Sequence, residues 1–270
     1  MLCVSFLLLA AGVQSQEAPA DSVPSGESEM DPAGSAAVPV FDPRSPFSIY
    51  KSNYLIYGSS DDQVKAQFGF KYEMFRNSGI FLAYRQIMFW NYYDKSSPIT
   101  EIDLMPELFW NYGTDVDFLR VGVYEHKSNG QDGLTSRAWD RSYVQYRYST
   151  GDFFNMGVDI KAFYIWQTGV ENPDIDDYLG YYEAEIFFRF LKSGPGRLTD
   201  KEELYIRGGT GRANFGFDFS KGWVEAGLKF RMVLTSIMPH FYIQFFYGYG
   251  ETMIGYNEKD WSIRGGLVLD

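Results

Sequence analysis

The chain has 270 residues, of which 45% are hydrophobic, 22% are charged and 19% are aromatic, and its formal net charge is -11 at pH 7. A mean hydropathy of -0.26, without any apolar run of 18 residues, excludes a bundle of membrane-spanning helices. A pI near 4.7 argues against nucleic acid as a partner, and one cysteine with two histidines argues against a Cys/His zinc site. A soluble β protein or a transmembrane β-barrel remains, since alternating apolar residues never build a hydropathy peak.

The first 46 residues predict export of the chain. Residues 1–15 form an apolar stretch that places Val13 and Ser15 at the third-last and last positions expected before a signal-peptidase cut. The basic region that usually opens a signal peptide is missing, as it would be from a truncated start. Residues 16–46 are rich in Pro, Ala, Ser, Gly, Glu and Asp, a composition that cannot bury a core. We therefore expect a signal peptide over 1–15, a disordered acidic linker over 16–46 and a folded domain over 47–270.

From about Tyr50 onward, apolar residues alternate with polar ones, which is the period of a β-strand. Runs of about 11–15 residues exceed the roughly 5–6 residues usual for strands in soluble domains and suffice to cross a bilayer at a tilt. In residues 152–166 the apolar positions are Phe154, Met156, Val158, Ile160, Ala162, Tyr164 and Trp166. Twelve such segments occur, at 50–60, 64–75, 79–93, 103–113, 117–128, 138–150, 152–167, 177–191, 201–217, 222–235, 239–252 and 260–270.

These segments predict an all-β fold, a twelve-stranded antiparallel transmembrane β-barrel. An even number of strands closes the sheet and removes the edges that lipid could not satisfy. Both signs of charge occupy the polar face, which indicates an interior of paired charges rather than an open pore. Short turns and longer loops alternate, as in outer-membrane barrels. The longer loops are expected at Lys95–Ile102, Ser128–Ala138, Gly169–Asp176 and Thr252–Lys259.

The hairpin around residues 124–141 carries side chains suited to nucleophilic catalysis. His126 and Ser128 are two apart on a strand and so share a face, with Cα atoms about 6.5 Å apart. If the loop is symmetric about Gly133, His126 pairs with Asp140, which shares the parity of the apolar residues of its own strand. The three side chains would then meet on the lipid-facing surface. A base that takes the serine proton and a carboxylate that orients this base are what acyl transfer by serine needs.

A second interpretation gives this hairpin no catalytic role, because His-x-Ser pairs are common and a histidine at a barrel rim is usually interfacial. A polar triad on a face that should be apolar is costly without a role, which favours catalysis. Gln86 poses a similar choice. It shares parity with Leu82, Tyr84, Met88 and Trp90, and it indicates either an irregular register or a hydrogen bond across a dimer interface.

Several short motifs follow one another at characteristic spacing over most of residues 45–270. They are Asn53-Tyr54-Leu55-Ile56-Tyr57, Ser96-Ser97-Pro98, Pro106-Glu107-Leu108-Phe109, His126 with Ser128-Asn129-Gly130, Thr135-Ser136-Arg137, Asn172-Pro173-Asp174-Ile175 and Gly248-Tyr249-Gly250-Glu251. Together they resemble the outer membrane phospholipase A family, the bacterial outer-membrane calcium-dependent phospholipases with a twelve-stranded barrel.

The resemblance implies a multi-pass enzyme of the bacterial outer membrane that hydrolyses the sn-1 and sn-2 acyl esters of phospholipid, with calcium as cofactor and as a homodimer. It implies that Ser128 is the nucleophile, His126 the base and Asp140 the third member of the triad. The amide of Gly130, assisted by calcium-bound water, would stabilise the oxyanion. The family also has a glutamine at the place of Gln86, which supports the dimer-interface interpretation.

The family's calcium ligands map onto the Ser136 hydroxyl, the backbone carbonyl of Gln131 and the carbonyl of Ser96 of the partner subunit. Ligation by oxygen alone suits this hard cation. The loop departs from the family pattern because Gly133 stands where an acidic residue is expected, with Asp132 beside it. This departure bears on calcium affinity, although two of the three implied contacts are backbone carbonyls.

The third triad member also departs from the family, which usually has asparagine where this chain has Asp140. An aspartate orients the histidine as well and stabilises its charged form more, at a higher cost near lipid. We expect retained activity with a shifted pH profile. Two other functions stay open from the sequence: a non-catalytic outer-membrane pore or structural barrel that keeps the hairpin as ancestry, and an esterase that acts on other acyl esters.

Overall fold

A computed structural model describes residues 46–60, 62–114, 117–150, 154–190, 199–213, 216–232 and 240–269. The expected signal peptide and nearly all of the acidic linker lie outside these residues. The strands are β1 (Phe47–Ile49), β2 (Asn53–Ser59), β3 (Val64–Glu73), β4 (Ile80–Trp90), β5 (Ile99–Gly113), β6 (Phe118–Ser128), β7 (Ala138–Thr150), β8 (Phe154–Thr168), β9 (Tyr182–Phe190), β10 (Thr199–Ala213), β11 (Gly216–Met232), β12 (His240–Gly248) and β13 (Asp260–Leu269).

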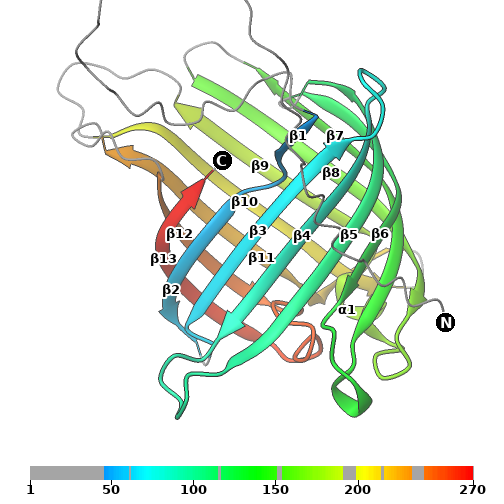
Figure 1. Cartoon of the computed structure of the whole chain (residues 1–270), viewed down its shortest axis with the longest axis vertical. Helices are drawn as coiled ribbons and strands as arrows, with labels where there is room; N and C mark the ends of the chain where they lie inside the picture. Colours follow the sequence, from blue (N-terminus) through cyan, green and yellow to red (C-terminus); the bar gives the residue numbers. More distant parts are fainter. Residues whose placement is uncertain are drawn as a thin grey trace, which may run out of the picture. The chain divides into compact units, whose positions relative to one another are not determined.

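Strands β2 to β13 pair in sequence order as antiparallel neighbours, and β13 pairs back onto β2. The predicted twelve-stranded barrel is therefore confirmed (Figure 1). Along β8 the outward side chains are apolar and exposed, such as Ile160 and Tyr164, whereas Asp159 and Phe163 between them are buried. No helix among the described residues is long and apolar enough to span a membrane.

The first strand differs from its prediction in one local feature. Strand β1 and strand β2 both pair with β3, β1 near its end and β2 near its start. The two pieces therefore continue one another along the same edge, in the place of the single segment expected at 50–60. The chain is interrupted at Lys51, whose backbone adopts the left-handed conformation with a φ of 62°.

Two other segments differ in their boundaries. Residues 177–181 were expected in a strand, but Ile175–Leu179 form the short helix α1, which packs Ile175 against Trp139 and Met253 at the loop end of the barrel. The turn expected after residue 217 comes earlier, between β10 and β11. Asp218 to Gly222 form a bulge instead, in which the Asp218 carboxylate accepts hydrogen bonds from the amide and the hydroxyl of Ser220.

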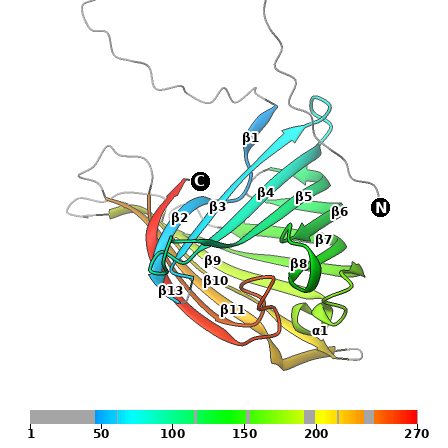
Figure 2. The ribbon, with the colours of Figure 1, turned by 60° about the horizontal axis from the view of Figure 1, so that its bottom comes forward.

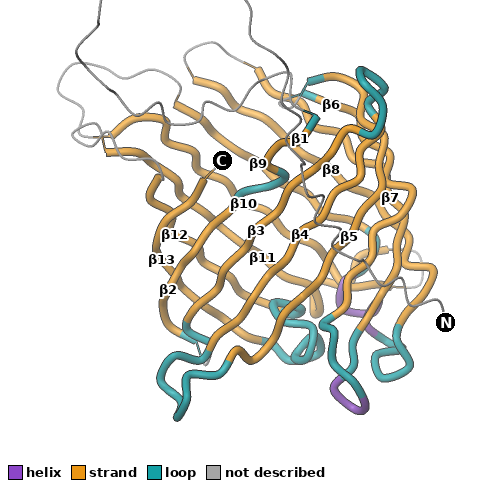
Figure 3. Tube along the Cα trace, viewed as in Figure 1, coloured by secondary structure: helices purple, strands orange, loops and turns teal. Residues whose placement is uncertain are grey.

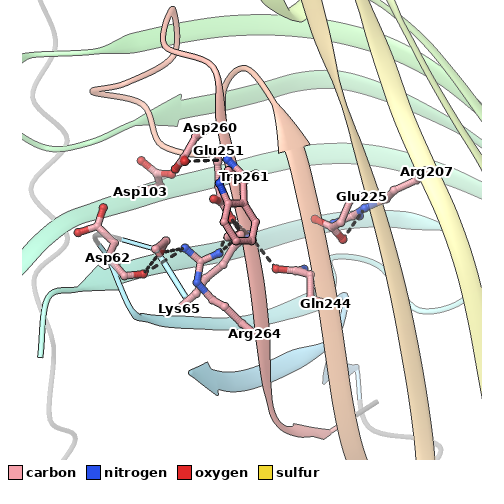
Figure 4. A network of polar contacts seen from close by, with 12 residues as sticks. Asp62, Lys65, Asp103, Arg207, Glu225, Gln244, Glu251, Asp260, Trp261 and Arg264 are labelled. Carbon is pink, nitrogen blue, oxygen red and sulfur yellow. Dashed lines mark hydrogen bonds and ion pairs between the residues drawn. The ribbon is translucent and has the colours of Figure 1, made fainter. Parts of the chain in front are cut away.

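In Figure 2 the barrel is turned so that its long-loop end comes forward. The lumen inside it has two unlike halves. The half toward the long loops, which we call the long-loop half, holds a cluster of buried residues: Trp139, Tyr143, Phe163, Ile165, Ile175, Met253 and Tyr256. Beside it, the Glu251 carboxylate accepts hydrogen bonds from Lys65 (3.1 Å) and Arg264 (2.5 Å) (Figure 4). A cavity of about 620 Å³, lined mainly by polar and charged side chains, occupies the half toward the short turns, the short-turn half, and extends to Glu125 and Arg141 behind the β6–β7 hairpin.

Candidate active site on the outer wall

The candidate site lies where β6 and β7 meet at the long-loop end. His126 pairs with Asp140 and Ser128 pairs with Ala138, which is the register expected from a symmetric loop. Nδ1 of His126 lies 2.7 Å from Oδ1 of Asp140, and the histidine side chain is 25% exposed while the aspartate side chain is 11% exposed. The hydrogen bond engages Nδ1, so Nε2 of His126 is the nitrogen left for a proton acceptor.

A β-bulge in β6 turns these side chains outward. Gly122 pairs with Tyr143 and Glu125 with Arg141, so β6 has one extra residue over this stretch, and the same shift occurs against β5. Val123 and Tyr124 are therefore both exposed, at 60% and 38%. Before the bulge the odd-numbered residues of β6 face outward, and after it the even-numbered ones do. Bulges commonly re-aim side chains near active sites, and this one places His126 and Ser128 on the lipid-facing wall.

The inner face of the same hairpin is fixed by ion pairs. Glu125, next to His126, accepts a hydrogen bond from Arg141, next to Asp140, at 2.8 Å, and a second from Lys161 at 2.7 Å. Lys127 lies 2.9 Å from the buried Asp103. Because a slip of one residue would expose these charges to lipid, the inner pairs hold the register on which the outer contact depends.

Two aromatic side chains flank the histidine, and the sequence interpretation gave them no role at the site. The ring of Tyr124 stacks on the His126 imidazole, with centroids 6.3 Å apart and an interplanar angle of 11°, and the ring of Trp166 lies 6.1 Å from Tyr124. A second bulge lies at Trp166, since Asp140 pairs with Gln167 and Arg141 with Ile165. The break in alternation at Val123-Tyr124, two successive apolar residues before a polar run, is the signal that could have located the first bulge.

Ser128 lies on the same outer face, paired with Ala138 on one side and with Leu104 of β5 on the other. The hydrogen bonds of the described residues include none between Ser128 and His126. Catalytic hydrogen bonds often tighten only when substrate is bound. The structure therefore brings His126 and Asp140 into direct contact and places Ser128 one outward position further along the strand.

The loop after Ser128 is organised by the side chain of Asn129, a role that sequence reasoning did not assign. Its amide nitrogen donates to the Thr135 carbonyl at 2.8 Å, and its oxygen accepts from the backbone N–H groups of Gln131 (3.3 Å) and Arg137 (3.0 Å). Gly130, between the two arms, has a φ of 65°, a conformation that suits glycine. Residues Gly133–Thr135 form a short 3₁₀ helix in this loop (Figure 3).

The oxygens expected to hold calcium are free of other bonds. Among the described residues, no hydrogen bond involves the Gln131 carbonyl, the Ser136 hydroxyl or the Ser96 carbonyl. Asp132 instead caps the 3₁₀ helix through a 2.7 Å hydrogen bond from the N–H of Gly133. The described part of the chain contains no cluster of three or more His, Cys, Asp or Glu residues that could hold a metal. Free carbonyl and hydroxyl oxygens fit calcium, which prefers oxygen ligands.

Gln86 lies in the same cross-strand row as Ser128. It pairs with Leu104, and Leu104 pairs with Ser128, so only one strand separates the two residues on the outer face. The Tyr84 hydroxyl donates to the Gln86 side-chain oxygen at 2.9 Å. Gln86 therefore lies in a regular register, which removes the irregular-register interpretation, and no hydrogen bond among the described residues uses its N–H₂ group.

A family model described as Phospholipase A1 matches residues 44–269. The chain is 28% identical to Phospholipase A1 of Escherichia coli (strain K12), over 83% of this chain and 82% of that protein. It is 27% identical to Phospholipase A1 of Klebsiella pneumoniae, over 100% of this chain and 98% of that protein. Among solved structures it is similar to the calcium-bound outer membrane phospholipase dimer of Salmonella typhi, with a TM-score of 0.68, 26% identity and coverage of 83% and 93% of the two chains.

Proposed function

Because the chain belongs to the phospholipase A1 family and folds as a multi-pass outer-membrane β-barrel, we propose that this phospholipase hydrolyses both the sn-1 and the sn-2 acyl esters of membrane phospholipid. The reaction takes place on the outer wall of the barrel, depends on calcium and requires a homodimer. The observation that carries this proposal is the 2.7 Å contact between His126 and Asp140 on the lipid-facing surface, one outward position from Ser128.

In the proposed mechanism, Ser128 Oγ attacks the acyl carbonyl carbon while its proton moves to Nε2 of His126. Asp140 keeps the Nδ1 proton of the histidine in place and stabilises the imidazolium that forms. The Nε2 proton then passes to the leaving oxygen, and water hydrolyses the acyl-enzyme by the same proton route. Asp140 lies beside a partly exposed histidine next to lipid, where a carboxylate is costly. Its retention there is therefore best explained by its contact with His126.

The oxyanion is stabilised by the backbone N–H of Gly130, which the Asn129 side chain and the positive φ of Gly130 hold at the start of the loop. The Ser136 hydroxyl and the carbonyl of Gln131 would hold calcium, together with the carbonyl of Ser96 of the partner subunit. Calcium at this position would polarise a water toward the oxyanion and supply positive charge close to it.

The dimer is proposed to form through the outer face that carries Gln86. Leu82 and Phe68 are exposed there and provide apolar surface, and the N–H₂ of Gln86 offers a hydrogen bond whose strength is greater without water. The implied partner ligand at residue 96 requires a second copy near this face. We also propose that residues 1–15 direct export and that residues 16–46 act as an acidic spacer ahead of the barrel.

Release of fatty acid from phospholipid micelles, with calcium and with a chelator, tests this function. We expect release from both acyl positions that stops with the chelator and with Ser128→Ala, whereas Thr150→Ala, which removes an outward hydroxyl at the opposite end of β7, retains it. A folded, dimeric barrel that releases no fatty acid would support the non-catalytic alternative. Full activity in a chemically verified monomer would contradict the proposed dimer.

A further inference from the structure

The cavity in the short-turn half has an excess of positive charge. Ten Lys or Arg and six Asp or Glu side chains line it, although the chain as a whole has a net charge of -11. Its volume of about 620 Å³ lies within the range of roughly 300–1,000 Å³ typical of small-molecule sites. It extends to Phe118, at the start of β6, and to Arg189, near the end of β9. The cavity therefore reaches the end of the barrel where the short turns lie.

The carboxylates of the lining are already engaged. Glu203 pairs with Arg189 and with Lys229. Asp159 and Glu185 both lie within 3.2 Å of Arg147. Glu107 accepts hydrogen bonds from the hydroxyls of Tyr50 and Tyr143. Few acceptors therefore remain for the other cations.

Two cations of the lining have only neutral partners. Arg120 lies over the rings of Phe109 (4.4 Å) and Phe118 (4.3 Å), and the Lys51 ammonium lies 5.6 Å from the centre of the Tyr50 ring. Arg120 donates to the side-chain oxygen of Asn111 at 3.1 Å and to the Tyr50 hydroxyl at 3.4 Å. Among the described residues, the Lys51 ammonium has no ion pair or hydrogen bond, and its side chain is exposed within the lumen. Unpaired cations in a concave, low-dielectric surrounding focus a positive potential on the space between them.

The backbone conformation of Lys51 also favours a function for this cation. Its φ of 62° interrupts what would otherwise be one strand from Phe47 to Ser59. A non-glycine residue in this conformation is energetically unfavourable. Glycine or asparagine would relieve the cost but would leave no cation at this point of the cavity wall.

From these observations we propose that the short-turn half of the lumen is a binding site for a small multivalent anion that bears a phosphate group, held by Lys51 and Arg120. A guanidinium binds phosphate oxygens in a bidentate way and an ammonium adds a point charge. The site lies inside the barrel wall and is separate from the outer wall that carries His126. Its ligand enters from the short-turn end, and binding does not require hydrolysis.

Phosphorus-31 NMR titration of the full-length barrel, folded in non-ionic detergent at low ionic strength, tests the proposal with inorganic phosphate as probe. We expect saturable binding of one phosphate per barrel, with unchanged affinity in Ser128→Ala. Lys51→Gln should weaken binding about tenfold, the effect of losing roughly 1.4 kcal/mol, and Lys51→Arg should restore it. Lys259→Gln, which removes an exposed lysine at the long-loop end, is the matched control and should leave it unchanged.

Lys51→Asn guards against a folding artefact, because asparagine tolerates the left-handed conformation; it should fold and bind as weakly as Lys51→Gln. Phosphate that binds without saturation, or equally well to wild type and Lys51→Asn, would overturn the proposal. sn-Glycerol 3-phosphate should bind more tightly than glycerophosphocholine, because the monoester carries two charges and the diester headgroup one. The reverse order would overturn the assignment of a multivalent anion.

Discussion

The two halves of the lumen differ in how they treat charge. In the long-loop half, the side chains of Glu251, Lys65 and Arg264 are at most 6% exposed and neutralise one another beside a hydrophobic cluster. In the short-turn half, cations outnumber carboxylates around a cavity. The contact between His126 and Asp140 lies on the outer wall at the long-loop end, and the cavity reaches Glu125 and Arg141 behind it. The difference indicates that charges are paired and packed toward the long loops, whereas space and unbalanced charge are kept toward the short turns.

The largest effect is expected at the β6 bulge, which determines which side chains of β6 face outward. Insertion of one alanine between Tyr124 and Glu125 should move the later residues of β6 to the opposite face, turn Glu125 and Lys127 toward lipid and turn His126 and Ser128 inward. Each charge on the lipid face costs about 2–4 kcal/mol. We expect loss of hydrolysis by more than about 1,000-fold, together with impaired insertion, measured by fatty acid release and by protease protection in vesicles. Val123→Ala keeps the bulge and should remain active; an insertion variant with ordinary activity would contradict the outward switch.

Removal of one carboxylate from each half should show how much each half contributes to the free energy of unfolding. Glu251→Ala leaves Lys65 and Arg264 buried without their partner, which should lower the free energy of unfolding by about 3–5 kcal/mol. Glu203→Ala acts in the half that holds the cavity, where water can reach Arg189 and Lys229, and should cost about 1 kcal/mol. Urea titration of the barrels in lipid vesicles measures both. Equal losses would show that the two halves are packed alike.

Acidification should weaken the buried ion-pair network of Glu251, Lys65 and Arg264. Burial alone would raise the pKa of the Glu251 carboxyl, but the charges of Lys65 and Arg264 lower this pKa below its ordinary value. The carboxylate therefore contributes stability above the ordinary glutamate pKa of about 4.3, and this contribution is lost as the pH falls through the lowered folded-state pKa. The stability difference between wild type and Glu251→Gln should be present at pH 7 and vanish at strongly acid pH. A pH-independent difference would contradict this.

The calcium loop should respond more moderately. Asn129→Ala removes the hydrogen bonds that connect both arms of the loop, each worth about 1 kcal/mol. We expect the calcium concentration for half-maximal hydrolysis to rise about tenfold, with a similar rate at saturating calcium. Asp132→Asn is the matched control, because its amide oxygen can still cap the 3₁₀ helix. A lower rate at saturating calcium without a shift in calcium dependence would place Asn129 outside the metal loop.

The smallest change is expected at Asp140. Asp140→Asn keeps an oxygen for His126 but removes the negative charge that favours the protonated imidazole. Hydrolysis should change by less than about tenfold, while the acid limb of the pH–rate profile moves to lower pH. Asp159→Asn, inside the lumen, should leave the profile unchanged. Superimposable profiles of wild type and Asp140→Asn would remove the carboxylate's charge from the mechanism.

Alternation along the chain predicted the barrel because lipid imposes it on every strand. The pairing of His126 with Asp140 also followed from the sequence, since a symmetric loop fixes its own register. The bulge at Val123 could not be derived, because it depends on pairing with both β5 and β7 at once. The helix α1 was missed because Tyr178, Gly180 and Tyr182 extend the alternation of β9 toward the N-terminus. Its own apolar residues, Ile175, Tyr178 and Leu179, have helical spacing and pack on the cluster that contains Trp139 and Met253.

In the proposed function, the outward position of His126 and Ser128 means that the enzyme is immersed in its own substrate. A soluble hydrolase waits for molecules to arrive from bulk water, whereas here every lipid that touches this wall is a candidate for cleavage. The supply of substrate is therefore never limiting, and the number of active barrel surfaces in the membrane must limit the rate of hydrolysis. If two copies are needed, that number rises with the square of their crowding in the membrane plane. Lateral dilution, as in a growing membrane, would then silence the enzyme without any inhibitor.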